Sequence, residues 1–66
     1  MERVGNTVYE KRHAAGLTQE ELAKGARVSR QTIIAIEKGN YAPSVALALR
    51  LARVLKTRVE DLFTIV

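Results

Sequence analysis

The chain has 66 residues, of which 47% are hydrophobic, 27% are charged and none is cysteine. A chain of this length makes one small domain, expected here over residues 1–66, and without cysteine it has neither disulfides nor thiolate metal sites. Its net charge of +4 favours an anionic partner. The sequence has neither a signal-peptide pattern nor a run of roughly 18 apolar residues, so we expect a cytoplasmic protein that does not cross a membrane.

Five helix starts are predicted from capping residues. The segments Thr7–Glu10, Thr18–Glu21 and Thr57–Glu60 each place a threonine three residues before a glutamate, which is the pattern of a capping box. Ser29 and Ser44 are simpler N-caps, since a serine hydroxyl accepts a hydrogen bond from a free amide of the first turn. We therefore expect helices over about residues 7–15, 18–25, 29–38, 44–55 and 58–63.

Glycines mark two of the helix ends. Gly16 follows the first predicted helix and Gly39 follows the third. Glycine takes the left-handed backbone conformation that ends a helix at little steric cost. Both helices are therefore expected to stop at these positions.

The third predicted helix has two different faces when its residues are projected at about 100° each. Ile33 and Ile36 fall on one side, with Thr32 beside them. The opposite side gathers polar and basic groups around one large aliphatic side chain: Arg30, Gln31, Ile34, Ala35 and Lys38. Such an aliphatic group has no core to enter and suits a thymine methyl group or a dry protein contact. This face is predicted to meet DNA, while the simpler alternative is that its polar residues are only solvated.

The fourth predicted helix is more apolar than one packing face requires. Projection leaves only the sector of Ala46, Arg50 and Arg53 polar or small, so apolar groups cover about 220° where one face needs about 100°. The surplus predicts a dimerisation region over about residues 44–66. Its expected interface residues are Val45, Leu49, Leu62, Phe63 and Ile65. The alternative is a helix wrapped on all sides at the centre of a five-helix bundle.

The two ends of the chain are expected to meet. Phe63–Val66 is apolar and is predicted to be extended, pairing with Arg3–Val4 as a short β ribbon. The fold class expected from these elements is all-α, with five helices and a short terminal ribbon.

The motifs, taken in order, resemble a known family over about residues 7–63. The motifs are LTQEELA at Leu17–Ala23, VSRQTI at Val28–Ile33, IEKG at Ile36–Gly39, Pro43–Ser44, and VEDLF at Val59–Phe63. Together they resemble the λ-repressor/Cro-type (XRE) transcriptional regulators in their short, single-domain form. The resemblance implies a five-helix λ-repressor-like fold with its helix-turn-helix at about 18–38. It also implies a sequence-specific repressor that binds a palindromic operator in double-stranded DNA as a homodimer, through the major groove.

The resemblance assigns roles to individual side chains. Those it places at base edges are Arg30, Gln31, Ile34 and Ala35. Those it places at phosphates are Gln19, which also braces the recognition helix, Ser29, Lys38, Asn40 and Tyr41. The chemistry agrees, because arginine bridges guanine O6 and N7 and glutamine bridges adenine N6 and N7, each for about 1–3 kcal/mol of discrimination. Arg12 and Glu37 are implied to form a structural ion pair between the first and third helices, the alternative being that both are solvated independently.

The sequence departs from the family pattern at the turn between the second and third helices. The residue before Val28 is usually glycine or asparagine in the family, and here it is Arg27. A left-handed conformation at a residue with a Cβ costs on the order of 1 kcal/mol. Either Arg27 accepts this conformation, or Gly25 lets the turn begin earlier.

Catalysis finds little support in the sequence. His13 is the only histidine, and the acid pairs Glu20–Glu21 and Glu60–Asp61 fall in first helical turns, where they complement the helix dipole. We expect no enzyme activity, no metal and no cofactor. A second interpretation is a protein-interaction module on the same scaffold, such as an antitoxin or accessory subunit. The polar set on the third helix favours DNA binding over this module, which would have no physical need for it.

Overall fold

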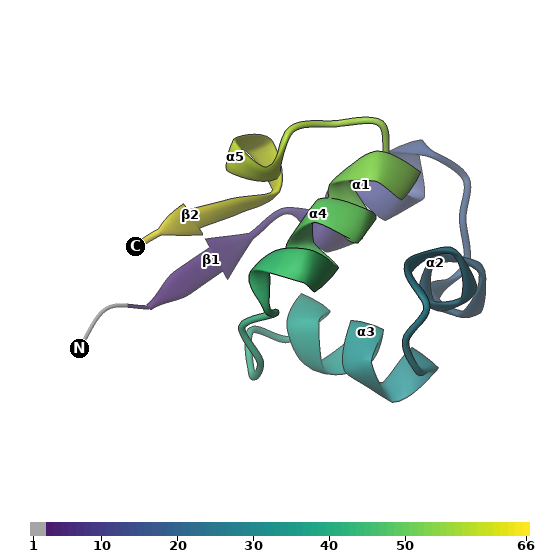
Figure 1. Ribbon diagram of the computed structural model, residues 1–66, viewed down its shortest axis with the longest axis horizontal. Coiled ribbons are helices and arrows are strands. Elements are labelled where there is room, and N and C mark those ends of the chain that lie inside the picture. Colours follow the sequence, from purple (N-terminus) through teal and green to yellow (C-terminus); the bar gives the residue numbers. More distant parts are fainter. Residues whose placement is uncertain (1–2) are drawn as a thin grey trace.

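Five helices and two short strands follow one another in the computed structural model, which describes residues 3–66; the first two residues of the domain expected over 1–66 lie outside that part. The elements are β1 (Val4–Asn6), α1 (Val8–Ala14), α2 (Gln19–Ala26), α3 (Arg30–Glu37), α4 (Val45–Val54), α5 (Val59–Leu62) and β2 (Phe63–Ile65). Figure 1 shows α1 to α4 gathered on one side, with α5 and the β ribbon at the opposite end. The predicted fold class, five helices with a short terminal ribbon, is confirmed.

The core takes one face from each helix. Its largest fully buried side chains are Val8, Leu22, Ile33, Ile36, Leu51 and Leu62. α2 packs against both α3 and α4, so it connects the recognition helix predicted from the sequence to the fourth helix. The inward face predicted for the third helix is confirmed, since Ile33 and Ile36 are both 0% exposed.

Three of the predicted N-caps are present. Thr18 forms a full capping box, in which its hydroxyl accepts from the Glu21 amide at 3.0 Å and the Glu21 carboxylate accepts from the Thr18 amide at 2.8 Å. The Ser29 hydroxyl accepts from the Thr32 amide at 3.3 Å, and the Ser44 hydroxyl accepts from the Leu47 amide at 3.2 Å. These caps define the starts of α2, α3 and α4.

The capping boxes predicted at Thr7 and Thr57 are wrong. The Thr7 hydroxyl donates instead to the Asp61 carbonyl at 2.7 Å, and Asn6 Oδ1 accepts from the Val8 amide at 3.1 Å. α5 begins one residue later than predicted, after Arg58, whose side chain makes no cap. At Thr7 the reason is tertiary, because the chain enters α1 directly from β1 and the Thr7 amide donates to the Leu62 carbonyl at 2.9 Å.

The turn between α2 and α3 is made by Arg27 itself. Arg27 lies in the left-handed region at φ 61° and ψ 44° and forms the C-cap of α2. Gly25 remains inside α2, where a Cβ would lie 3.1 Å from Val54 Cγ2. Of the two alternatives for this turn, the first therefore holds, and Gly25 serves a close approach between α2 and α4.

The terminal ribbon is antiparallel and longer than expected. Val4 pairs with Ile65, Gly5 with Thr64 and Asn6 with Phe63, and beyond them the Val66 amide donates to the Arg3 carbonyl at 2.9 Å. The predicted pairing of the two chain ends is thus present and continues to Asn6. Within residues 3–66 no helix has the length and apolar character needed to cross a membrane.

Candidate nucleic-acid interface

One face of α3 carries the side chains that the sequence predicts to read bases. Arg30 and Gln31 are exposed, whereas Ile34 and Ala35 are half-buried on the same helix. Figure 1 shows α3 along the lower edge of the molecule, with no other element beneath it. The outward side chains of Arg30 and Gln31 are therefore accessible, while Ile34 and Ala35 are partly covered by the described part of the chain.

Side chains predicted to contact phosphates lie at both ends of this face. At the N-terminal end Ser29 is exposed, although its hydroxyl already accepts the Thr32 amide. At the C-terminal end Lys38, Asn40 and Tyr41 are all exposed. The helix ends here in a tight turn, in which the Asn40 amide donates to the Ala35 carbonyl at 2.9 Å and Gly39 has a φ of 78°.

The inner side of the C-terminal end of α3 is held by a buried ion pair. Arg12 Nε of α1 donates to Glu37 Oε2 at 2.6 Å, and the two side chains are only 9% and 7% exposed. Arg12 Nη2 donates to Glu37 Oε1 at 3.3 Å, and Gln19 of α2 adds a third contact, since its Nε2 donates to the same oxygen at 3.1 Å. Arg12 Nη1 also donates to the Leu17 carbonyl at 2.9 Å. Arg12 and Gln19 thus orient α3 from behind, as the resemblance implies.

The ion pair also removes an electrostatic obstacle. An unpaired carboxylate beside a surface that binds DNA would repel phosphates, whereas Glu37 is neutralised by a guanidinium in direct contact. The hydrogen bond from Arg12 to Glu37 raises the pKa of Arg12 above its ordinary value, although burial acts in the opposite direction. A buried pair of this kind determines geometry more than it adds stability.

Two further side chains hold the helix-turn-helix through contacts that the sequence does not reveal. Asn6 Nδ2 donates to the Ile36 carbonyl in the last turn of α3 at 2.8 Å. Arg50 Nε donates to the Ala26 carbonyl at the end of α2 at 2.8 Å. Asn6 could have been noticed as an N-cap residue, but its second contact joins residues 30 positions apart and leaves no local signal.

A shallow polar concavity joins the N-terminal ends of α2 and α3. It is lined by Arg12, Thr18, Gln19, Glu20 and Arg30. Gln19 and Arg30 offer donors there, and the first amides of α2 add the positive end of a helix dipole. This arrangement is chemically suited to one phosphate oxygen, with Glu20 as the opposing charge at its rim.

The residues predicted at a dimer interface do not all lie on the surface. Val45, Leu49 and Ile65 are 77%, 55% and 68% exposed, and Phe63 is half-buried. Leu62 is 0% exposed and belongs to the core, so its assignment to the interface is wrong. The physical reason is that α5 has only four residues and packs against α4, so its one fully buried side chain closes the core there.

The fold and this interface define a helix-turn-helix DNA-binding domain. A model of the helix-turn-helix family matches residues 8–62. The chain belongs to this family, within its XRE-type transcriptional regulators. Because the family consists of transcriptional regulators, the expectation of a protein that is not an enzyme is confirmed.

Relatives and solved structures agree with this assignment. An HTH-type transcriptional regulator of Methanothermobacter thermautotrophicus is 56% identical over 57 residues, covering 85% of this chain and 83% of the relative. The HTH-type regulator YgzD of Bacillus subtilis is 45% identical over 58 residues, covering 88% of each. The restriction-modification controller protein C.AhdI of Aeromonas hydrophila superimposes with a TM-score of 0.77 at 31% identity, covering 82% of each chain. The clp gene regulator ClgR of Corynebacterium glutamicum gives 0.78 at 30% identity, covering 82% of this chain and 57% of its own.

Proposed function

We propose that this DNA-binding regulator is a sequence-specific repressor that inserts α3 into the major groove of a palindromic operator as a homodimer. The observation that carries the proposal is the pairing of a free outward face on α3 with a firmly held inner face. Arg30 and Gln31 are exposed, while Arg12 and Gln19 hold Glu37 from behind. A helix held in this way presents its side chains in one geometry, as direct base readout requires.

In this proposal the two ends of the outward face act differently from its middle. Arg30 and Gln31 read base edges, with Ile34 and Ala35 against base methyl groups. Gln19, Ser29, Lys38, Asn40 and Tyr41 contact phosphates and determine where α3 lies along the duplex. Phosphate contacts supply affinity without sequence preference, whereas base contacts supply the preference.

Symmetry determines the form of the operator. Two copies related by a twofold axis place their α3 helices in successive major grooves, so the half-sites are inverted and about 34 Å apart. A bound dimer then covers a promoter that overlaps the operator and excludes the polymerase. A protein with this function works beside the chromosome, in the cytoplasm.

Selection of bound fragments from random duplex DNA by the purified protein tests the proposal. We expect enrichment of an inverted repeat with half-site centres about one helical turn apart, at 10–10.5 base pairs. A shuffled sequence of the same composition is the matched control and is expected to bind only weakly and in a strongly salt-dependent way. Enrichment of no sequence would contradict specific readout, and enrichment of a single half-site would contradict the dimer.

A protein-interaction module on the same scaffold is the second candidate, and the exposed apolar side chains of α4 are the observation that favours it. Val45 and Leu49 would then contact a different protein. The same selection separates the two candidates, because a module without a DNA function has no reason to retain a preferred sequence.

A further inference from the structure

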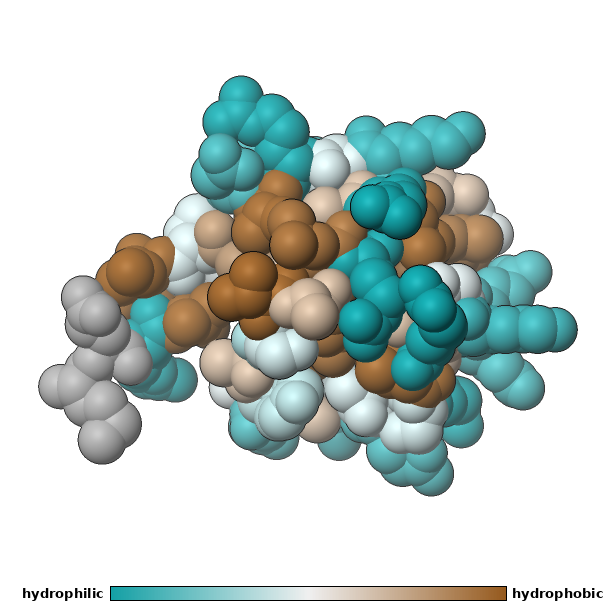
Figure 2. All heavy atoms as spheres, viewed as in Figure 1, coloured by the Kyte–Doolittle hydropathy of each residue, from teal (hydrophilic) through white to brown (hydrophobic). Residues whose placement is uncertain are grey.

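An apolar patch crosses one face of the molecule from α4 to the terminal ribbon. Its members are large side chains left wholly or partly exposed: Val4, Val45, Leu49, Phe63 and Ile65. Val4 and Ile65 are direct cross-strand partners, and Phe63 lies two residues from Ile65, so these three share one face of the ribbon. Figure 2 shows hydrophobic side chains gathered in the middle of this face, bordered by hydrophilic ones.

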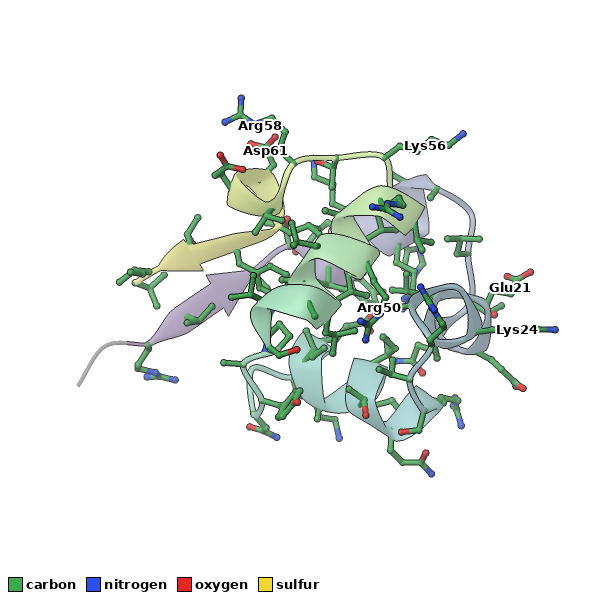
Figure 3. All side chains as sticks on the ribbon, viewed as in Figure 1. Glu21, Lys24, Arg50, Lys56, Arg58 and Asp61 are labelled. Atoms are coloured by element: carbon green, nitrogen blue, oxygen red, sulfur yellow. The ribbon has the colours of Figure 1, made fainter. Side chains whose placement is uncertain are left out.

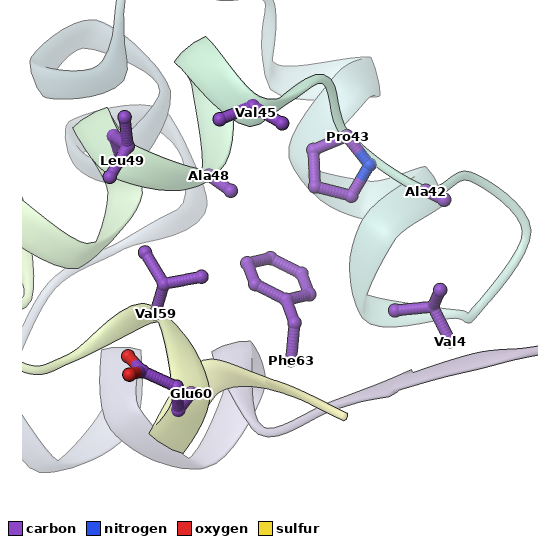
Figure 4. Close-up of a pocket in the computed structure, with 9 residues that line it drawn as sticks. All are labelled: Val4, Ala42, Pro43, Val45, Ala48, Leu49, Val59, Glu60 and Phe63. Carbon is purple, nitrogen blue, oxygen red and sulfur yellow. The ribbon is translucent and has the colours of Figure 1, made fainter. Parts of the chain in front are cut away.

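A groove runs through the patch between α4 and α5. Figure 4 shows Val45 and Leu49 of α4 on one side, Val59 and Glu60 of α5 on the other, and the Phe63 ring between them. Its volume is about 270 Å³, which lies below the range of about 300–1,000 Å³ typical of sites for small molecules. The groove therefore fits side chains of a second protein surface better than a free ligand.

Charges of opposite sign lie beside the patch. Glu60 is the one charged side chain among the residues that line the groove. Arg53 follows Val45 and Leu49 at a spacing of four residues, so it continues the same ridge of α4 beyond the end of the groove. Arg53 is exposed and makes no ion pair with any residue of the range 3–66.

We infer that the patch is a self-complementary interface with a second copy of this chain, in which Arg53 of each copy pairs with the partner's Glu60. A twofold axis makes every contact between two different positions occur twice. With the axis near Leu49, the ridge that ends in Arg53 extends over the partner's groove. The groove then receives apolar side chains, and its acidic rim meets the basic end of the opposite α4.

Charge complementarity is what selects a second copy as the occupant. The patch carries its own basic and acidic ends, so a copy of itself satisfies both, whereas an unrelated partner would have to supply each separately. The intrachain competitor is weak, because Arg58 Nη2 lies 3.6 Å from Glu60 Oε2 and both side chains are more than 70% exposed. The inference rests on the homodimer of the proposed function and adds the residues that fix its register.

Charge reversal followed by sedimentation of the full chain tests the pair. Arg53→Glu and Glu60→Arg are each expected to raise the dimer dissociation constant by about tenfold, because every reversal acts twice across the axis. The double variant restores opposite charges and is expected to return to within about threefold of the unmodified protein. A double variant no tighter than the weaker single variant would overturn the pair.

Matched controls use the same change in charge away from the groove. Lys24→Glu lies on α2 and Asp61→Arg lies on α5 beside Glu60 but outside the groove lining, and Figure 3 labels both positions. Both control variants are expected to leave the dimer dissociation constant unchanged. An increase equal to that of the single variants Arg53→Glu and Glu60→Arg would overturn the inference. Thermal melts followed by circular dichroism show whether each variant folds. If a charge reversal does not fold, Arg53→Gln or Glu60→Gln takes its place, and a smaller increase in the dimer dissociation constant is expected.

The outcome distinguishes this inference from the proposed function. A dimer that binds its operator but shows no coupling between positions 53 and 60 overturns the pair alone. An unmodified protein that remains monomeric at micromolar concentration overturns both the pair and the homodimer, and leaves the patch to a different partner.

Discussion

Asn6 of β1 donates through its side-chain amide to the Ile36 carbonyl at 2.8 Å, which ties the first strand to the last turn of α3. The same side chain accepts from the Val8 amide at 3.1 Å and so begins α1. Through this one residue the terminal ribbon, α1 and α3 are held in a common frame. The ribbon therefore supports α3, the helix proposed to contact DNA, at its C-terminal end.

Replacing Asn6 tests this connection. Asn6→Ala loses both hydrogen bonds and is expected to lower the free energy of unfolding by about 1–2 kcal/mol. The Ile36 carbonyl keeps a second donor, the Gly39 amide at 2.9 Å, which limits the cost. Asn6→Asp retains the acceptor for Val8 but not the donor for Ile36. Urea unfolding measures the free energy of unfolding of both variants. In Asn6→Asp we also expect faster amide hydrogen exchange in α3, because its carbonyl partner has lost a donor. Thr64→Ala is the control.

Removing one member of the Arg12–Glu37 pair is expected to be far worse than replacing both. Glu37→Leu leaves a buried guanidinium without its carboxylate, at a cost of about 3 kcal/mol. Adding Arg12→Met removes the stranded charge and is expected to recover most of that loss. Thermal unfolding of the two single variants and the double variant checks this, and additive losses would contradict the coupling.

Acid is expected to weaken the cap of α2. Hydrogen bonds from the backbone and side chain of Thr18 lower the pKa of Glu21 below its ordinary value of 4.5. A lowered pKa in the folded state means that this contribution to stability is present above about pH 4.5 and is lost as the pH falls through the folded-state value. Glu21→Gln is expected to remove this part of the pH dependence, while Glu20→Gln retains it. Melting temperatures between pH 3 and pH 6 provide the comparison.

Two substitutions on α3 are expected to weaken DNA binding in different ways. Lys38→Ala removes a proposed phosphate contact, so affinity is expected to fall for all sequences and the slope of log K against log salt to decrease by about one. Arg30→Ala removes a proposed base contact and is expected to relax specificity at one base pair by about 1–3 kcal/mol. Lys24→Ala, on α2, is the control for charge. Unchanged affinity and slope in both α3 variants would contradict the assigned face.

Relieving the backbone at Arg27 is expected to stabilise the fold. Arg27 has a φ of 61°, which costs on the order of 1 kcal/mol at a residue with a Cβ. Arg27→Gly removes this strain but gains flexibility in the unfolded chain, so a net gain of about 0.5 kcal/mol is expected in urea unfolding. Lys24→Gly, inside α2, is expected to lose about 1 kcal/mol by the ordinary helix penalty.

Local patterns determined most of the secondary structure. The caps at Thr18, Ser29 and Ser44 were predictable because each hydroxyl meets an amide only three residues away. The buried face of α3 was predictable because helical periodicity places Ile33 and Ile36 on one side. The Arg12–Glu37 pair was accessible only through the family resemblance, since its members lie 25 residues apart.

Tertiary structure decided what a local pattern cannot encode. Thr7 has the sequence of a cap, but its hydroxyl contacts the Asp61 carbonyl because β1 brings α5 beside it. Leu62 has the apolar character of an interface residue, but its side chain is fully buried in the core of its own chain and is not accessible to a partner. Sequence by itself determined which elements form and which face of α3 is polar, because those properties depend on neighbours within one turn. Only the folded chain decided how Asn6, Gln19 and Arg50 hold the helix-turn-helix, because their partners become neighbours only when the helices pack.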